Sequence, residues 1–208
     1  MTPRSRRRPE KVDFRKTRPE LYRASRDVSE IRAGRGTFLA IDGVGEPGGP
    51  AYQEAIGRIF ALAYTAKFTL KAAGTVDFAV PALECLWFDD PKETPRNEWR
   101  WRLLVRIPDQ ILARDLQPIR KSLAEKKRLD TSSVKRITWT EGLALQILHV
   151  GPYDTLGAAF ETLMTSARER GLECAGAGHE IYLSDPRRVA PAKIRTIVRM
   201  EMRRAPKR

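Results

Sequence analysis

Cysteine and histidine are scarce in this chain of 208 residues, which contains only Cys85, Cys174, His149 and His179 of these two kinds. No two of them stand at the short spacing typical of Zn²⁺ ligands, so the sequence predicts no metal site. Both cysteines lie in apolar-leaning contexts, and we expect reduced thiols rather than a disulfide.

Long apolar runs and nucleotide-binding motifs are also absent. No stretch approaches the roughly 18 consecutive apolar residues of a membrane-spanning helix, and no apolar segment of a secretory signal follows the basic N-terminus. We therefore expect a cytoplasmic protein that does not contact membranes. The sequence has no G-x-S-x-G, Walker A or G-x-G-x-x-G motif, and the glycine-rich DGVGEPGG lacks the Lys-Ser/Thr of a phosphate-binding loop. Serine-triad hydrolysis and a nucleotide cofactor have no support.

Acidic residues are outnumbered, and the formal net charge is +13. Eight of these net charges fall in residues 1–11 and 203–208. We expect residues 1–10 to be a disordered basic tail. Basic tails make weak, non-specific contacts with nucleic acids, which leaves a nucleic-acid-associated regulator as one alternative function.

Hydrophobic periodicity predicts two similar units within one domain that spans residues 11–208. The first unit, about 36–108, has a strand at 37–45, a helix at 51–71 and strands at 82–88 and 99–108. A helical connector at 109–130 is interrupted at Pro118. The second unit, about 134–202, repeats this order with a strand at 142–154, a helix at 155–171 and strands at 179–186 and 193–202. Residues 1–35 show no regular pattern.

The two units match in sequence as well as in order. LECLWFDDP aligns with HEIYLSDP, which places Glu84 opposite Glu180 in the alignment, and TFLAIDGVG aligns with LALQILHVG. We predict an α+β fold in which two pseudo-symmetric strand–helix–strand–strand repeats form an antiparallel sheet, with the helices packed on one face. Small-molecule sites favour such junctions, so we expect a central ligand pocket between the halves.

Glu84 and Glu180 are the leading candidates for chemistry, because each lies in apolar sequence rather than in a charged run. A carboxylate on an apolar strand costs free energy to bury unless it is paired. A partly desolvated glutamate has a raised pKa and can act as a general acid or base, or attract a cationic ligand. The alternatives are an exposed strand face and a structural ion pair with an arginine.

Aromatic residues make up 8% of the chain, and several fall close to the strand ends or the turns: Tyr64, Trp87, Trp99, Trp101, Tyr153 and Tyr182. Such side chains suit stacking on a flat ligand and cation–π contacts. Ordinary core packing is the alternative for each tryptophan. On a regular strand, Trp87 and Glu84 face opposite ways.

Five segments together resemble the GyrI-like small-molecule-binding family. They are FLAIDGVGEPGGPAYQEAIGRIFALAYTAKF, PALECLWF, WRWRLLVRIPD, ALQILHVGPYD and HEIYLSDPRRVAPAKIRTIVR, and the likeness covers roughly residues 11–202. The resemblance implies two repeats around a central pocket in which a glutamate among aromatics binds bulky, often cationic, aromatic molecules. Glu180 occupies the matching motif.

The resemblance also implies a stand-alone member without a DNA-binding domain. Some stand-alone relatives are similar to metal-independent hydrolases that open the electrophilic cyclopropane of DNA-alkylating toxins. In these enzymes pocket Trp, Tyr and Glu residues position the substrate and activate water. Here Glu180 is the expected catalytic residue. The ligand-binding candidates are Tyr64, Glu84, Trp87, Trp101, Tyr153 and Tyr182. The alternative is a module that binds or sequesters drugs without catalysis, or that partners a ligand-sensing transcription regulator.

Overall fold

The computed structural model describes residues 9–206, so the predicted basic tail falls almost wholly outside the described residues. The elements are β1 Lys11–Val12, α1 Phe14–Thr17, α2 Pro19–Tyr22, β2 Ser29–Ala33, β3 Gly36–Val44, α3 Pro50–Ala72, β4 Asp77–Phe78, β5 Leu83–Trp87, η1 Arg96–Glu98, β6 Arg100–Ile107, α4 Ala113–Lys127, β7 Lys135–Trp139, β8 Gly142–Val150, η2 Tyr153–Thr155, α5 Leu156–Glu169, β9 Leu172–Tyr182, η3 Pro191–Lys193 and β10 Arg195–Arg204. None of the helices in this part of the chain combines the length and apolar character needed to cross a membrane.

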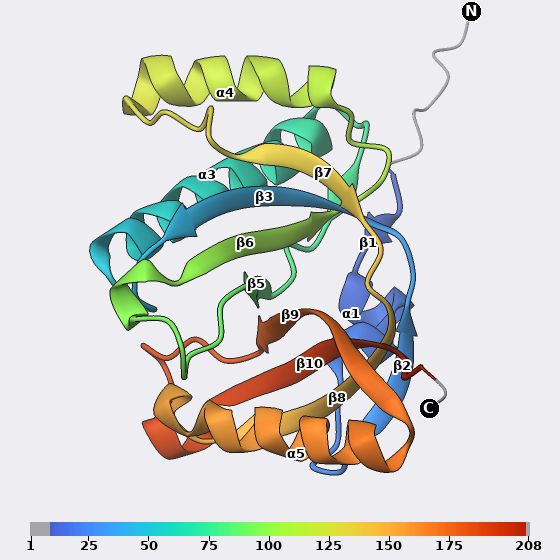
Figure 1. The fold of residues 1–208 in the computed structure, drawn as a ribbon. Coiled ribbons are helices and arrows are strands. Elements are labelled where there is room, and N and C mark those ends of the chain that lie inside the picture. The colour runs from blue at the N-terminus through green and yellow to red at the C-terminus, as the bar shows by residue number, and fades with distance from the viewer. Residues whose placement is uncertain (1–8, 207–208) are drawn as a thin grey trace, which may run out of the picture.

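Eight strands form one sheet in the order β2-β8-β10-β9-β5-β6-β3-β7, and each neighbouring pair is antiparallel. The predicted α+β class with an antiparallel sheet is confirmed. Helix α3 packs with β3 and β6, and α5 packs with β8, β9 and β10 (Figure 1). Strands β5 and β9 meet in the middle, where the two halves join.

The register at this junction corrects the alignment of the repeats. Cys85 pairs with Glu180, and Glu84 pairs with Ile181. The neighbouring strands extend the relation, because Cys85 pairs with Leu103 and Glu180 pairs with Val198. Asp90 follows Cys85 by five residues, as Asp185 follows Glu180, so aligning the two Asp-Pro stops places a pseudo-two-fold axis through the Cys85–Glu180 pair. The counterpart of Glu180 is Cys85, not Glu84, and a shift of one residue moves a side chain to the other face of the sheet.

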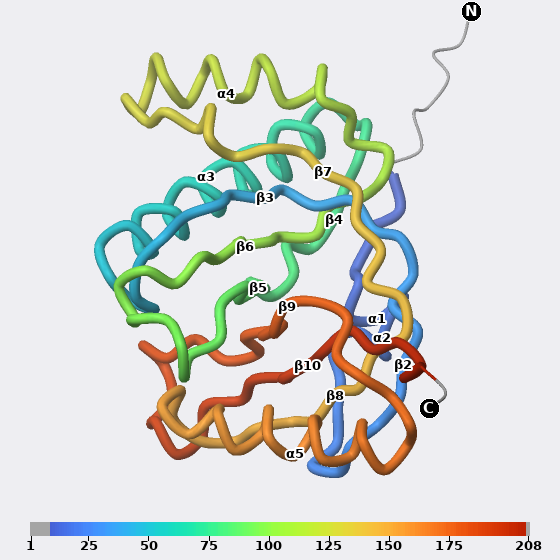
Figure 2. The backbone as a smooth tube through the Cα atoms, viewed as in Figure 1, coloured from blue at the N-terminus to red at the C-terminus, as the bar shows by residue number. Residues whose placement is uncertain are grey.

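The two edge strands are exchanged between the halves. Strand β2, from the N-terminal segment, pairs with β8 of the second half, whereas β7 pairs with β3 of the first half. The expectation that residues 1–35 are irregular was wrong for β2 and for the short helices α1 and α2. Figure 2 shows the chain running from β2 up to β3 and from β7 down to β8 along one side of the molecule. We call these four strands the crossing ribbon.

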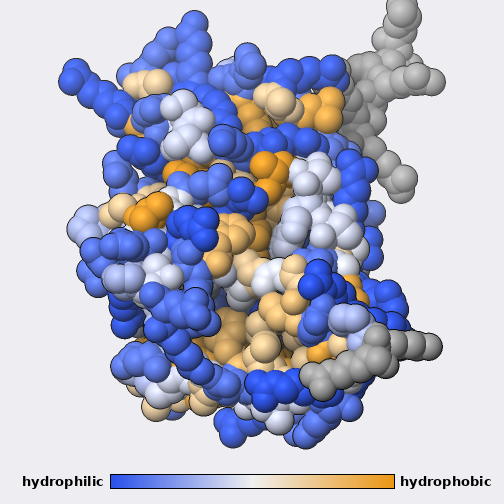
Figure 3. Space-filling model, viewed as in Figure 1, coloured by the Kyte–Doolittle hydropathy of each residue, from blue (hydrophilic) through white to orange (hydrophobic). Residues whose placement is uncertain are grey.

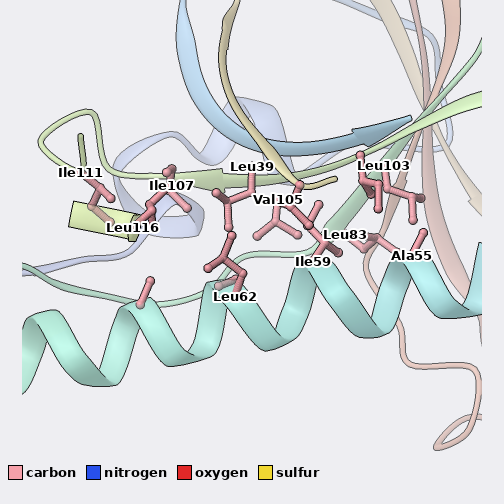
Figure 4. Packing of buried hydrophobic residues seen from close by; sticks show 14 of the residues in the cluster. Leu39, Ala55, Ile59, Leu62, Leu83, Leu103, Val105, Ile107, Ile111 and Leu116 are labelled. Carbon is pink, nitrogen blue, oxygen red and sulfur yellow. The ribbon is translucent and has the colours of Figure 1, made fainter. Parts of the chain in front are cut away.

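The core of the first half lies between α3 and the sheet (Figure 4). Ala55, Ile59 and Leu62 recur at three- and four-residue spacing on α3 and pack toward Leu39 and Val105. Burying a leucine or isoleucine side chain of this kind contributes about 1.5–3 kcal/mol. Leu156, Ala159, Leu163 and Ala167 of α5 form the equivalent stripe over the second half.

Helix α4 continues through Pro118, where the sequence predicted an interruption. The proline removes one intrahelical hydrogen bond. Leu116, Ile119 and Leu123 are all buried in the first core, and their packing offsets that loss.

The opposite face of the sheet is covered by the N-terminal segment rather than by α3 and α5. Phe14, Leu21 and Tyr22 pack against Ile181 and Ile197 there. We call the side of the sheet that α3 and α5 cover the helix face, and the side that α1 and α2 cover the ribbon face. The prediction that the helices share one face is true of α3 and α5, but the short helices α1 and α2 lie on the other.

Candidate functional site

Glu180 lies on the helix face of β9, beside the junction between the halves. Its strand partner is Cys85 in β5, and only 8% of its surface is exposed. Strand alternation places Tyr182 on the same face two residues further on. In the space-filling view, hydrophobic residues gather in the middle of one side of the molecule between hydrophilic borders (Figure 3).

A chain of hydroxyl groups leads to the carboxyl group of Glu180. The Tyr182 hydroxyl donates to Oε2 of Glu180 at 2.8 Å, and the Tyr52 hydroxyl lies 3.1 Å from that of Tyr182. A phenol has one proton to donate, so Tyr52 donates to Tyr182 while Tyr182 donates to the carboxylate. Tyr52 comes from α3, and the chain therefore joins the first half to the second.

Aromatic rings surround this chain. The Tyr52 ring is stacked on Trp87, with centroids 5.7 Å apart and planes at 10°, and it meets Trp101 edge-on at 5.1 Å. Tyr153 meets Tyr182 edge-on at 5.7 Å. Trp87 and Tyr153 are half-buried, so each keeps part of its ring surface accessible to solvent. We call Glu180, Tyr52, Trp87, Tyr153 and Tyr182 the Glu180 cluster.

The protonation states of the cluster follow from its burial. Burial raises the pKa of Glu180 to about 7, although the hydrogen bond from Tyr182, the indole of Trp87 and the charge of His179 act in the opposite direction. Burial also raises the pKa of Tyr182 and of Tyr52 well above 10, so both phenols are neutral donors. The pKa of the Cys85 thiol is raised by burial and by Glu180, which keeps it protonated. At neutral pH only the carboxyl group changes its charge.

Glu84 does not belong to this cluster. It lies on the ribbon face, where Oε1 accepts a hydrogen bond of 2.9 Å from Tyr22 and Oε2 lies 3.1 Å from Nε2 of His179. Strand alternation explains the separation, because Glu84 is one residue from Cys85 and so faces away from Glu180. The structural ion pair considered for a strand glutamate therefore describes Glu84 better than a place beside the Glu180 cluster does.

Trp101 and Tyr64 have different surroundings. Trp101 is only 2% exposed and packs in the first core beneath Tyr52, so it supports the cluster from below. Tyr64 is 44% exposed on α3, where it packs against Phe60 and Lys67. The structure thus brings together Glu180, Trp87, Tyr153 and Tyr182 of the predicted residues, with Trp101 below them.

Tyr52 was missed by the sequence analysis. It stands on the same stripe of α3 as Ala55 and Ile59, and that spacing could have placed it on the helix face. Its hydroxyl contact with Tyr182 depends on the packing of α3 over the junction, which periodicity does not specify. Among residues 9–206, no group of three His, Cys, Asp or Glu side chains is arranged to hold a metal ion.

The family model of the GyrI-like small molecule binding domain matches residues 36–201. The chain belongs to this family. The match spans both repeats and the whole Glu180 cluster, and it confirms the resemblance inferred from the sequence. None of the curated proteins compared with this GyrI-like chain matches it.

Solved structures agree with the GyrI-like assignment. A hydrolase from Listeria innocua is 34% identical, with a TM-score of 0.84, and the alignment covers 92% of this chain and 100% of that one. An uncharacterized conserved protein from Listeria innocua is 33% identical over the same shares, with a TM-score of 0.87. The C-terminal domain of EcmrR is 14% identical, with a TM-score of 0.58 over 86% of this chain and 98% of that one, and it shares the fold.

Proposed function

We propose that this GyrI-like protein binds bulky aromatic molecules, cationic ones among them, at the Glu180 cluster and hydrolyses an electrophilic cyclopropane of the kind found in DNA-alkylating toxins. The observation that carries the proposal is a buried carboxyl group with a pKa of about 7 among four aromatic side chains. The likeness to a hydrolase from Listeria innocua supports it. In this role the protein detoxifies its substrate.

The aromatic side chains supply the binding surface. Trp87, Tyr153 and Tyr182 are half-buried, and together they offer flat faces on which a polycyclic substrate can stack. The indole of Trp87 also favours the ionised form of Glu180. An ionised Glu180 adds attraction for a cationic ligand.

Glu180 supplies the base. In its ionised form it accepts a proton from water while the water oxygen forms a bond to a cyclopropane carbon. The strained C–C bond breaks, and its electron pair passes into the conjugated carbonyl group, whose oxygen takes up a proton from solvent. Glu180 then releases its proton to solvent, and the product is the substrate plus one water. A base whose pKa lies near the operating pH is the most efficient for this work.

The two hydroxyl groups orient the base. Tyr182 donates to Oε2 of Glu180, so the other carboxylate oxygen is the one proposed to take the proton from water. Tyr52 holds Tyr182 in turn, so the carboxylate is fixed from both halves of the protein. No metal takes part in the proposed step.

The test is mass spectrometry of a cyclopropane-containing alkylator after incubation with the protein. The expected product has gained one water, and Glu180→Gln should slow its formation about 10²- to 10⁴-fold. Glu54→Gln is the matched control, because that glutamate pairs with Arg58 on the surface of α3. Equal turnover in Glu180→Gln would reject Glu180 as the base. Quenching of tryptophan fluorescence by the alkylator without any product would instead indicate a sequestering protein.

A further inference from the structure

On the ribbon face, directly behind Glu180, lies a buried network of charges. His179 is 1% exposed, with Nδ1 at 2.8 Å from Glu141 and Nε2 at 3.1 Å from Glu84. Glu141 also accepts a hydrogen bond of 3.1 Å from Arg199. The network joins β5, β9, β10 and the turn between β7 and β8, so it ties the crossing ribbon to the central strands.

The geometry fixes the charge of His179. Each ring nitrogen faces a carboxylate oxygen, and carboxylates only accept hydrogen bonds. Both nitrogens must therefore carry a proton, which makes the ring an imidazolium. Each carboxylate has a second donor as well, Tyr22 for Glu84 and Arg199 for Glu141. Burial alone would lower the pKa of His179, but Glu141 and Glu84 raise it to about 9.

The imidazolium is next to Glu180 in the chain. His179 and Glu180 are consecutive residues of β9, so their side chains leave the same strand on opposite faces. Both side chains are buried, and water screens the attraction between buried charges only weakly. The helix face holds no cation in the Glu180 cluster, whose other members are two phenols from β9 and η2, a phenol from α3 and an indole from β5.

We propose that His179 is a positioning residue for Glu180: its charge, held in place by the network on the ribbon face, keeps the carboxyl group on the helix face available as an anion. Without that charge, only the hydrogen bond from Tyr182 and the Trp87 indole would oppose the effect of burial, and the balance would move toward the neutral acid. The network thus affects the ionisation of Glu180 across the sheet, in addition to joining the two halves. This role goes beyond the proposed hydrolysis and does not depend on it, since it concerns the ionisation of one carboxyl group.

The charged groups that face His179 come from several elements. On the ribbon face these are Glu84 from β5, Glu141 before β8, Arg199 from β10 and Arg106 from β6, with the phenol of Tyr22 from α2. They line a cavity of about 10 Å³. The Arg106 guanidinium lies against the rings of Phe14 and Phe38. The charges of the two carboxylates and the two arginines cancel. The network behind β9 therefore carries one net positive charge, that of the imidazolium.

The first measurement needs no variant. The chain has only two histidines, so ¹⁵N spectra of the imidazole rings contain two sets of signals, and His149→Gln assigns them. We expect both ring nitrogens of His179 to be protonated at pH 7.5. A neutral tautomer at that pH would overturn the proposal.

The second measurement follows the side-chain ¹³C signal of the Glu180 carboxyl group through a pH titration, with Glu180→Gln to assign it. In His179→Gln the midpoint should rise by about one pH unit. Tyr22→Phe is the control, because it removes a hydrogen bond from the same network and no charge, and its midpoint should stay at the wild-type value. If His179 only supported the structure, its loss would let water reach Glu180 and lower the midpoint of the titration. An unchanged or lowered midpoint in His179→Gln would therefore refute the proposal.

The outcome is separable from the proposed hydrolysis. Both titrations are made without ligand, and the shift is read on the carboxyl group itself. A protein that binds drugs without hydrolysing them would still show the raised midpoint. Conversely, active hydrolysis with no shift in His179→Gln would leave the function standing and reject the role of His179.

Discussion

The hydroxyl of Tyr182 donates a hydrogen bond to Glu180 two residues earlier on the same strand, at 2.8 Å. The contact is local in sequence, but its orientation depends on Tyr52 of the other half, whose hydroxyl lies 3.1 Å from that of Tyr182. The carboxyl group that could carry chemistry is therefore held by residues that only the folded sheet brings together.

Tyr182→Phe should shift the pH dependence of ligand binding or hydrolysis. The hydrogen bond favours the ionised form of Glu180, so its loss raises the pKa of the carboxyl group further above 7. We expect the midpoint of the pH profile to rise by up to about one unit, with lower activity at pH 7 and recovery at pH 9. Tyr153→Phe, whose ring meets Tyr182 but whose hydroxyl makes no contact with Glu180, is the control. Identical profiles for both variants would contradict this.

Glu180→Gln should make the protein more stable at alkaline pH. The pKa of Glu180 is about 7 in the fold against an ordinary value of 4.5, so the folded state binds the proton more tightly than the unfolded chain. The contribution of Glu180 to stability is therefore greatest below pH 4.5 and falls as the pH rises through 7, by at most about 3 kcal/mol. Chemical denaturation at pH 5 and pH 8 measures this. A variant less stable than the wild type at pH 8 would show that Glu180 is not buried as an unfavourable charge.

His179 should produce a second loss of stability at higher pH. Its pKa is raised from 6.5 to about 9 in the fold, so its contribution is complete below pH 6.5 and is lost as the pH rises through 9. Thermal melting between pH 6 and pH 10 should show a fall in Tm that His179→Gln abolishes. The Glu180→Gln protein should keep this fall in Tm, because the pH range over which Glu180 changes the stability ends near pH 7. A flat wild-type profile above pH 7 would be inconsistent with a buried imidazolium.

Gly43→Ala should destabilise the first half. A Cβ at this position of β3 would lie 2.1 Å from Cη2 of Trp101, the side chain beneath Tyr52. The indole must move, and we expect a loss of about 1–3 kcal/mol of stability together with altered tryptophan fluorescence. Gly57→Ala on α3 is the control, because nothing lies within 4 Å of its added carbon. That change should stabilise the helix by about 0.5–1 kcal/mol.

Hydrophobic periodicity within single elements was sufficient to predict most of the helices and strands. The alternation in WRWRLLVRIP places Trp101, Leu103 and Val105 toward α3, whereas Arg100 and Arg102 pair with aspartates on the other side. The stripes on α3 and α5 were likewise visible as three- and four-residue spacing. These features depend on the period of a single element, which the sequence carries directly.

Features that depend on pairing between elements were not predictable in the same way. Strand β2 has few apolar residues, and only its pairing with β8 makes it a strand. The motif alignment placed Glu84 with Glu180, but the register showed a difference of one residue and opposite faces. Tyr22 and Glu141, which hold the buried network, lie far in sequence from His179, and no motif links them.

The axis through Cys85 and Glu180 limits how alike the two halves can be. A residue on a pseudo-two-fold axis meets its own counterpart, so a protein with perfect repeats would place two carboxyl groups side by side in this buried pair. Like charges facing each other across two strands are destabilising, and such a pair would have to share one proton. A thiol opposite the carboxyl group removes that conflict. Divergence of the two copies at this position is thus a condition for having one ionisable acid at the centre of the sheet.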